Sequence, residues 1–117
     1  MPKTRLYLAG PMTGYPDWNY PAFMAAEDRL RQVGFLVTNP ARLGDPTQSW
    51  QCNMRRAIRA MLECDGVALL PGWSTSRGAR LEYQVARDLG IAATSWDLWI
   101  RLYENHDVEY FLATGGD

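Results

Sequence analysis

The chain has few cysteines, little excess charge and no long hydrophobic run. Cys52 and Cys64 are its two cysteines, and no histidine cluster accompanies them. We therefore expect reduced core thiols in a cytoplasmic protein and no metal site. The formal net charge is −1 and no basic run exceeds Arg55-Arg56, which argues against binding of a nucleic acid polymer. Neither a membrane-spanning segment nor a signal peptide is expected.

What is present is a regular alternation of apolar runs and helical patterns. The 117 residues suffice for one domain, 1–117, and no repeat or linker divides them. Strands are predicted at residues 5–9, 35–38, 66–70 and 91–95. Helices are predicted at residues 21–33, 50–62, 79–89 and 97–103. Residues 108–112 fit either a short fifth strand or part of a helix, since five residues are too few for periodicity to decide.

This order of elements predicts an α/β three-layer sandwich with right-handed crossovers. We expect a flavodoxin-like or Rossmann-like parallel sheet of four to five strands in the order 2-1-3-4-5. Strands one and three then lie side by side. The loops that follow them, at Gly10 and Gly72, would face each other across a crevice, where parallel sheets bind ligands.

Glu82 is the first candidate for chemistry, because it stands early in a predicted helix, where the helix dipole favours an anion. Gly78 and Ala86 share its helix face, so its neighbours there are small. A carboxylate held in this way can attack an electrophilic carbon or stabilise a cationic one. The alternative is a solvated glutamate that pairs with Arg80 or Arg87.

The turn after the first predicted strand is a second candidate. It consists of Gly10, Pro11, Met12, Thr13 and Gly14. Such a turn can present backbone N–H groups and a threonine hydroxyl to an anion. The alternative is a plain tight turn without a ligand.

The loop after the third predicted strand contains Gly72, Trp73, Ser74, Thr75 and Ser76. Its hydroxyl residues lie near a helix N-terminus, where they could hold a phosphate. They could equally cap the helix.

Tyr7 lies inside the first strand, on the face opposite to Leu6 and Leu8. A buried tyrosine needs a partner for its hydroxyl. Glu82 is one plausible partner, and another core group is equally so. Asn19 or Asp17 is expected to cap the first helix.

Three segments in order carry a family resemblance. They are residues 6–11 (Leu-Tyr-Leu-Ala-Gly-Pro), residues 64–73 (Cys-Asp-Gly-Val-Ala-Leu-Leu-Pro-Gly-Trp) and the Ser76-x-Gly78-x-x-x-Glu82 motif followed by Ala86. Together they resemble the nucleoside 2-deoxyribosyltransferase superfamily over about residues 4 to 96. The chain is most similar to the branch catalogued as DUF4406, which is common in bacteria and their phages.

The resemblance implies cleavage of the N-glycosidic bond of a nucleoside or nucleoside 5′-monophosphate, without a cofactor. It assigns nucleophilic attack on the anomeric carbon to Glu82 and orientation of that glutamate to Tyr7. It places the turn at Gly10–Gly14 on the sugar or phosphate, and Ser76 on the 5′-phosphate. The developing positive charge of an oxocarbenium-like transition state agrees with a carboxylate in this place. Further substrate contacts are expected from Trp18, Asn19, Gly72, Trp73, Ser74 and Gly78, with Trp18 or Trp73 stacked on the base.

The chain departs from the superfamily pattern at Ala57. Counting eight residues back from Asp65 reaches the position where relatives carry an aspartate. The acid could be relocated, with Asp17 and Asp45 as candidates, or the base could leave without much help. The chain could also be an engineered inactive variant, or a protein that binds nucleotides without cleaving them.

We therefore expect a hydrolase that releases free base and sugar phosphate from a (deoxy)nucleoside 5′-monophosphate. Base exchange by a deoxyribosyltransferase is the first alternative, and a non-catalytic nucleotide-binding protein is the second. A homodimer or higher homo-oligomer is expected. The C-terminal aromatic residues Trp96, Trp99, Tyr103, Tyr110 and Phe111 exceed the needs of one small core, and aromatics are enriched at interfaces.

Overall fold

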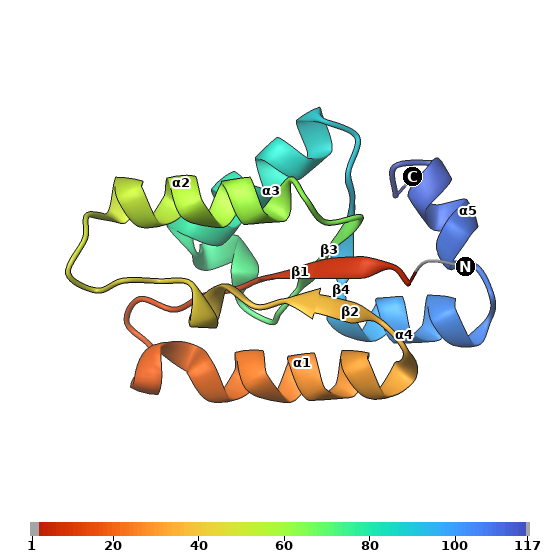
Figure 1. Cartoon of the computed structure of the whole chain (residues 1–117), viewed down its shortest axis with the longest axis horizontal. Coiled ribbons are helices and arrows are strands. Elements are labelled where there is room, and N and C mark those ends of the chain that lie inside the picture. The colour runs from red at the N-terminus through yellow and green to blue at the C-terminus, as the bar shows by residue number, and fades with distance from the viewer. Residues whose placement is uncertain (1–2, 117) are drawn as a thin grey trace.

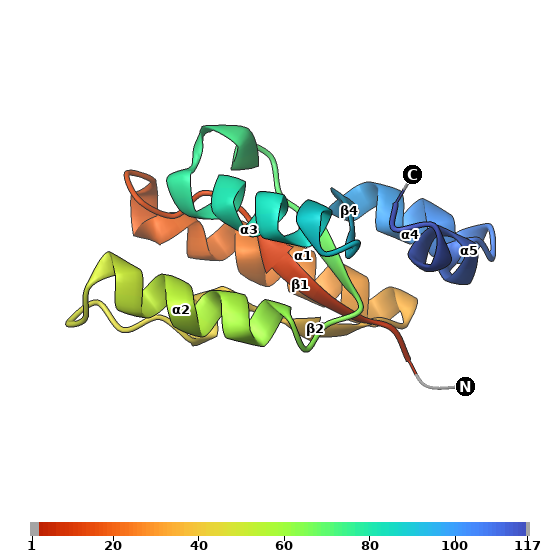
Figure 2. The same cartoon turned by 90° about the horizontal axis from the view of Figure 1, so that it is seen from above.

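The computed structural model describes residues 3–116 and has a four-stranded, all-parallel sheet in the order β2-β1-β3-β4. The strands are β1 (Arg5–Ala9), β2 (Leu36–Thr38), β3 (Gly66–Leu69) and β4 (Ala92–Ser95). Helices cover both faces of the sheet (Figures 1 and 2). The predicted three-layer α/β fold and the side-by-side placement of strands one and three are confirmed.

Five α-helices and three short 3-10 helices complete the described part of the chain. The α-helices are α1 (Tyr20–Val33), α2 (Trp50–Met61), α3 (Arg77–Asp88), α4 (Trp96–Glu104) and α5 (Val108–Ala113). The 3-10 helices are η1 (Pro16–Asn19), η2 (Pro40–Arg42) and η3 (Trp73–Thr75). Among residues 3–116, no helix is long and apolar enough to cross a membrane.

Alternation along β1 divides the core between the two faces of the sheet. Leu6 and Leu8 pack with side chains of α1, α4 and α5. Tyr7 and Ala9 point to the other face and pack with side chains of α2 and α3. β3 is buried along its whole length, as expected of a central parallel strand.

The C-terminal residues adopt the helical one of the two alternatives left open for them, and there is no fifth strand among residues 3–116. Residues 108–112 lie in α5, so the sheet ends at β4. Val108, Phe111 and Leu112 recur at helical spacing and pack against the core. The ring of Phe111 meets that of Trp99 edge to face, with centroids 5.2 Å apart.

Most of the aromatic residues near the C-terminus pack in this chain's own core. This corrects the expectation that they exceed what one core holds. Trp99 is fully buried, and its indole N–H donates to the Val67 carbonyl at 2.8 Å. Tyr103 packs edge-on against Phe35. Tyr110 is the clear exception, with 73% of its surface exposed. The aromatic count therefore gives no argument for a subunit interface.

Two smaller expectations also need correction. Cys64 is buried, but Cys52 is exposed and is not a core thiol, and neither forms a disulfide. Neither Asp17 nor Asn19 caps α1 through its side chain. Asn19 stands at the N-cap in the left-handed conformation, and its amide donates instead to the Pro11 carbonyl at 2.9 Å.

Candidate active site

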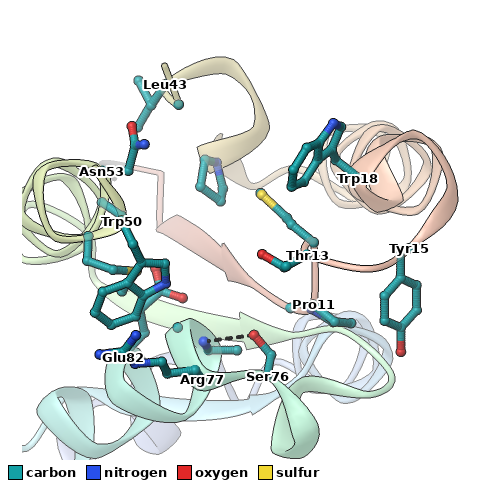
Figure 3. A pocket seen from close by; sticks show the side chains of 18 of the residues that line it. Pro11, Thr13, Tyr15, Trp18, Leu43, Trp50, Asn53, Ser76, Arg77 and Glu82 are labelled. Carbon is teal, nitrogen blue, oxygen red and sulfur yellow. Dashed lines mark hydrogen bonds between the residues drawn. The ribbon is translucent and has the colours of Figure 1, made fainter. Parts of the chain in front are cut away.

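A cavity of about 780 Å³ opens at the carboxyl ends of β1 and β3 (Figure 3). Its walls come from the turn after β1, the loop between β2 and α2, and the first turns of α2 and α3. The strand order predicts a crevice at these strand ends. Of the two glycines expected to face each other across it, Gly10 lines the cavity and Gly72 does not.

Glu82 lies in the wall of this cavity with only 5% of its surface exposed. The hydroxyl of the fully buried Tyr7 donates a hydrogen bond to Glu82 Oε2. The predicted Tyr7–Glu82 pair is therefore confirmed, although the two residues are 75 positions apart. The alternative of a solvated Glu82 paired with Arg80 or Arg87 is wrong, because no such ion pair is found within residues 3–116.

Burial controls the protonation of this pair. It raises the pKa of Glu82 to about 8, although the hydrogen bond from Tyr7 acts in the opposite direction. The pKa of Tyr7 is raised as well, first by burial and then by the neighbouring Glu82 carboxylate. At neutral pH Tyr7 therefore keeps its proton, and Glu82 is neutral in the larger part of the molecules.

Gly78 allows helices α2 and α3 to approach each other beside Glu82. A Cβ atom built on Gly78 would lie 3.1 Å from Met54 Sδ of α2. Gly78, Ala79 and Met54 all line the cavity, so the wall around the carboxylate is mostly apolar. This surrounding explains the raised pKa of Glu82.

The turn after β1 contributes four of its five predicted residues to the cavity. Gly10, Pro11, Met12 and Thr13 line it, whereas Gly14 does not. Thr13 turns its hydroxyl toward the cavity in Figure 3.

Trp18 also lines the cavity and stays 54% exposed. It belongs to a turn in which Asp17, Trp18 and Asn19 have positive φ angles of 52°, 55° and 61°. Left-handed backbone is unfavourable for residues with a Cβ and is concentrated at functional sites. Asn19 does not line the cavity, but its bond to the Pro11 carbonyl ties this turn to the turn after β1.

The loop after β3 contributes less than expected. Gly72, Trp73 and Ser74 do not line the cavity. Trp73 instead stacks on Tyr83, with ring centroids 4.5 Å apart, so the structure does not bring it to a bound base. Ser76 does line the cavity, and its hydroxyl caps α3 by accepting from the Ala79 N–H at 3.2 Å.

The loop before α2 and the first turn of α2 supply residues that the sequence did not assign to the site. Leu43 and Gln48 of the loop and Trp50 and Asn53 of α2 line the cavity, together with Asp45, which was expected only as a candidate acid. The side chain of Asn53 holds this loop, accepting from the Asp45 N–H and donating to the Asp45 carbonyl, both at 2.9 Å. No motif in the sequence marks these residues, because only the fold brings them to the cavity.

Ala57 lines the cavity as well. Of the two candidates for a relocated acid, Asp45 lines it and Asp17 does not. The Asp45 carboxylate accepts from the hydroxyl and the N–H of Thr47, which lowers the pKa of Asp45. Asp45 is therefore ionised at neutral pH.

A buried glutamate outside the cavity supports the loop after β2. Glu27 of α1 accepts hydrogen bonds from Arg31 at 2.9 Å, Asn39 at 2.9 Å and Arg42 at 3.1 Å. Burial alone would raise the pKa of Glu27, but these bonds outweigh it and lower the pKa. Asn39 and Arg42 flank Pro40, which lines the cavity, so this network supports one wall.

No group of three or more His, Cys, Asp or Glu side chains that could hold a metal ion is found in the described part of the chain. The groups that line the cavity include the buried Glu82 carboxyl group, the Asp45 carboxylate, the Tyr7 hydroxyl, serine and threonine hydroxyls, side-chain amides, one arginine and aromatic rings.

Comparison with known proteins gives one match. The sequence pattern that defines the family described as Domain of unknown function (DUF4406) matches residues 4–95. Neither a curated protein nor a solved structure matches the chain. The match spans β1 to β4 and includes Tyr7, Glu82 and the turn after β1. The chain therefore belongs to the DUF4406 family.

Proposed function

We propose that this protein hydrolyses the N-glycosidic bond of a (deoxy)nucleoside 5′-monophosphate through Glu82. The observation that carries the proposal is the buried Glu82 carboxyl group, hydrogen-bonded by Tyr7 in the wall of a cavity at the ends of β1 and β3. The resemblance of the motifs around both residues to nucleoside deoxyribosyltransferases supports the same function.

In the first step, a Glu82 carboxylate oxygen forms a bond to the anomeric carbon of the sugar. The bond from that carbon to the base nitrogen breaks, and its electron pair leaves with the base, which takes up a proton. In the second step, water attacks the anomeric carbon and loses a proton, and the ester bond to Glu82 breaks. The products are free base and sugar phosphate, and Glu82 is restored. The Tyr7 hydroxyl orients Glu82 in both steps.

No carboxyl group stands at Ala57 to protonate the leaving base. Asp45 is ionised, because its bonds with Thr47 lower its pKa, so it is suited to accept a hydrogen bond from the base. In this scheme the base takes its proton from water. Bases that leave as weakly basic anions are therefore the expected substrates.

The test is to incubate the protein with each nucleoside 5′-monophosphate and to separate the products by chromatography. Release of free base is expected from the wild type and not from Glu82→Gln, a change that removes the nucleophile and keeps the shape of the side chain. Glu63→Gln, at an exposed carboxylate outside the cavity, is the matched control and should cleave normally. Absence of free base with every nucleotide would contradict the proposal.

Ala57 favours a second candidate, a protein that binds a nucleotide without cleaving it. Native mass spectrometry would then find the nucleotide intact on the protein after long incubation. Adding a second free base to the cleavage assay tests the related possibility of base exchange. Appearance of a new nucleotide would assign transfer rather than hydrolysis.

We also propose that the protein works as a homodimer in the cytoplasm. Leu62 and Leu81 are 48% and 38% exposed. Together with Ile58 they line a shallow groove between α2 and α3. Burial of such side chains between two copies would be favourable.

A further inference from the structure

Arg77 is the one residue with a cationic side chain among the described residues that line the cavity. It is the first residue of α3, and Trp50, the first residue of α2, lies next to it. The Arg77 guanidinium carbon is 3.7 Å from the centroid of the Trp50 ring. Figure 3 shows the two side chains together on the same side of the cavity as Glu82.

Stacking on Trp50 leaves the N–H groups of the Arg77 guanidinium available to donate hydrogen bonds. A guanidinium that lies over an aromatic ring uses its face, and its N–H groups point outward in its own plane. Within residues 3–116, Arg77 forms neither a salt bridge nor a side-chain hydrogen bond. In contrast, Arg56 donates to the Leu43 carbonyl and to Gln48. Arg77 is thus held in place without using the groups that would bind an anion.

The spacing of Arg77 and Glu82 suits one part of a nucleotide. Both residues belong to α3 and both line the cavity. At a rise of about 1.5 Å per residue, five residues separate them by about 7.5 Å along the helix axis. A sugar 5-phosphate has its anomeric carbon and its phosphate at opposite ends, so its anomeric carbon can meet Glu82 while its phosphate meets Arg77.

We propose that Arg77, stacked on Trp50, binds the 5′-phosphate of the substrate and selects nucleotides over free nucleosides. This inference rests on the proposed function for the identity of the substrate. Arg77 forms charge-assisted hydrogen bonds with the phosphate oxygens, which a guanidinium contacts in a forked geometry. Trp50 acts as a positioning residue that limits the rotamers of Arg77.

The first test measures binding by calorimetry, with ribose 5-phosphate as the ligand and ribose as its uncharged control. Arg77→Ala should weaken binding of ribose 5-phosphate by about tenfold to a hundredfold, the usual effect of a hydrogen bond with a charged group. Arg77→Lys keeps the charge but loses the planar fork, so a smaller loss is expected. Trp50→Leu should also weaken binding of ribose 5-phosphate.

Arg80→Ala is the matched control, because Arg80 is an exposed arginine of the same helix that does not line the cavity. It should bind ribose 5-phosphate as the wild type does. Arg77 is itself exposed, so its variants should fold, and circular dichroism checks this. Equal binding by Arg77→Ala and the wild type would overturn the inference, as would failure of the wild type to bind ribose 5-phosphate at millimolar concentration.

The second test compares kcat/KM for a nucleoside 5′-monophosphate and for the corresponding nucleoside. Arg77→Ala should lower the value for the monophosphate by about tenfold to a hundredfold and leave that for the nucleoside unchanged. An equal loss for both substrates would overturn the inference while the proposed function stands. If the wild type cleaves nothing but binds ribose 5-phosphate through Arg77, the proposed function fails and the phosphate site remains.

Discussion

At the scale of single residues, burial determines the protonation state of the Tyr7–Glu82 pair. Glu82 is 5% exposed and its hydrogen-bond donor Tyr7 is fully buried. Burial raises the pKa of Glu82 to about 8, whereas the usual value of a glutamate is about 4.3. At neutral pH, the Glu82 carboxyl group is therefore protonated in the larger part of the molecules. Attack on a sugar requires the ionised form, so activity should rise with pH toward 8.

The same pKa shift predicts how the stability of the protein depends on pH. The pKa of Glu82 is higher in the folded than in the unfolded protein. At pH values between these two pKa values, the folded protein therefore binds one more proton than the unfolded protein. The stability that the folded protein gains from this proton is fully present below about pH 4.3 and is lost as the pH rises through about 8. The contribution of Glu82 to the free energy of unfolding should fall by about 1.4 kcal/mol per pH unit between these two pH values.

Glu82→Gln removes this titration while keeping the shape of the side chain. Its melting temperature should therefore exceed that of the wild type at pH 9, and the difference should shrink toward pH 5. Thermal unfolding from pH 5 to 9 measures this, with Glu63→Gln as the control at an exposed glutamate. If the melting temperatures of Glu82→Gln and the wild type change with pH in parallel, the pKa of Glu82 is not raised in the folded protein.

At the scale of elements, the cavity depends on close approach between segments that follow different strands. Gly10 follows β1 beside Leu70, and a Cβ atom built on Gly10 would lie 2.8 Å from Leu70 Cβ. The turn that lines the cavity therefore runs directly against the residue after β3. Gly78 has the corresponding role between α2 and α3, where its partner is the flexible Met54.

Gly10→Ala should destabilise the protein, because Leu70 Cβ is attached to a buried backbone and has little room to move. Overpacking of this kind costs about 1 to 3 kcal/mol. Gly44→Ala is the matched control, since Gly44 also lines the cavity but has no atom within 4 Å of an added Cβ. Urea unfolding of both variants measures the difference. Equal midpoints would contradict the close approach.

At the scale of the whole molecule, the two faces of the sheet serve different purposes. The face covered by α1, α4 and α5 holds the larger apolar cluster, with Trp99 at full burial. The face covered by α2 and α3 carries Glu82 and borders the cavity. The exposed apolar groove lies between α2 and α3, so self-association there would place a second copy near the cavity mouth.

The double variant Leu62→Glu, Leu81→Glu tests the homodimer. Two charges in the groove should oppose burial between copies and convert a dimer into a monomer. Sedimentation at micromolar concentration measures the mass, and Tyr110→Glu, at an exposed aromatic residue of α5, should leave it unchanged. A monomeric wild type would contradict the proposed dimer.

The sequence by itself was sufficient for the parallel sheet, but it left Glu82 as one of two equally plausible partners for Tyr7. Apolar runs and helical periods are local properties, and their alternation limits the order of strands β1 to β4 to a few possibilities. The contact between Tyr7 and Glu82 was implied by the family resemblance of their motifs, and it agrees with adjacent parallel strands that end at the same edge of the sheet.

Only the tertiary structure decided the C-terminal helix, the position of Trp73 away from the cavity, and the Arg77–Trp50 stack. The five residues 108–112 are too few for a period to distinguish strand from helix, and in the structure they lie in α5, which packs against Trp99 through Phe111. Trp73 is an aromatic residue in a loop next to the predicted crevice, where it could have contacted a base. In the structure it packs on Tyr83. Arg77 and Trp50 begin different helices. Their contact depends on how α2 and α3 pack together, which a local pattern does not contain.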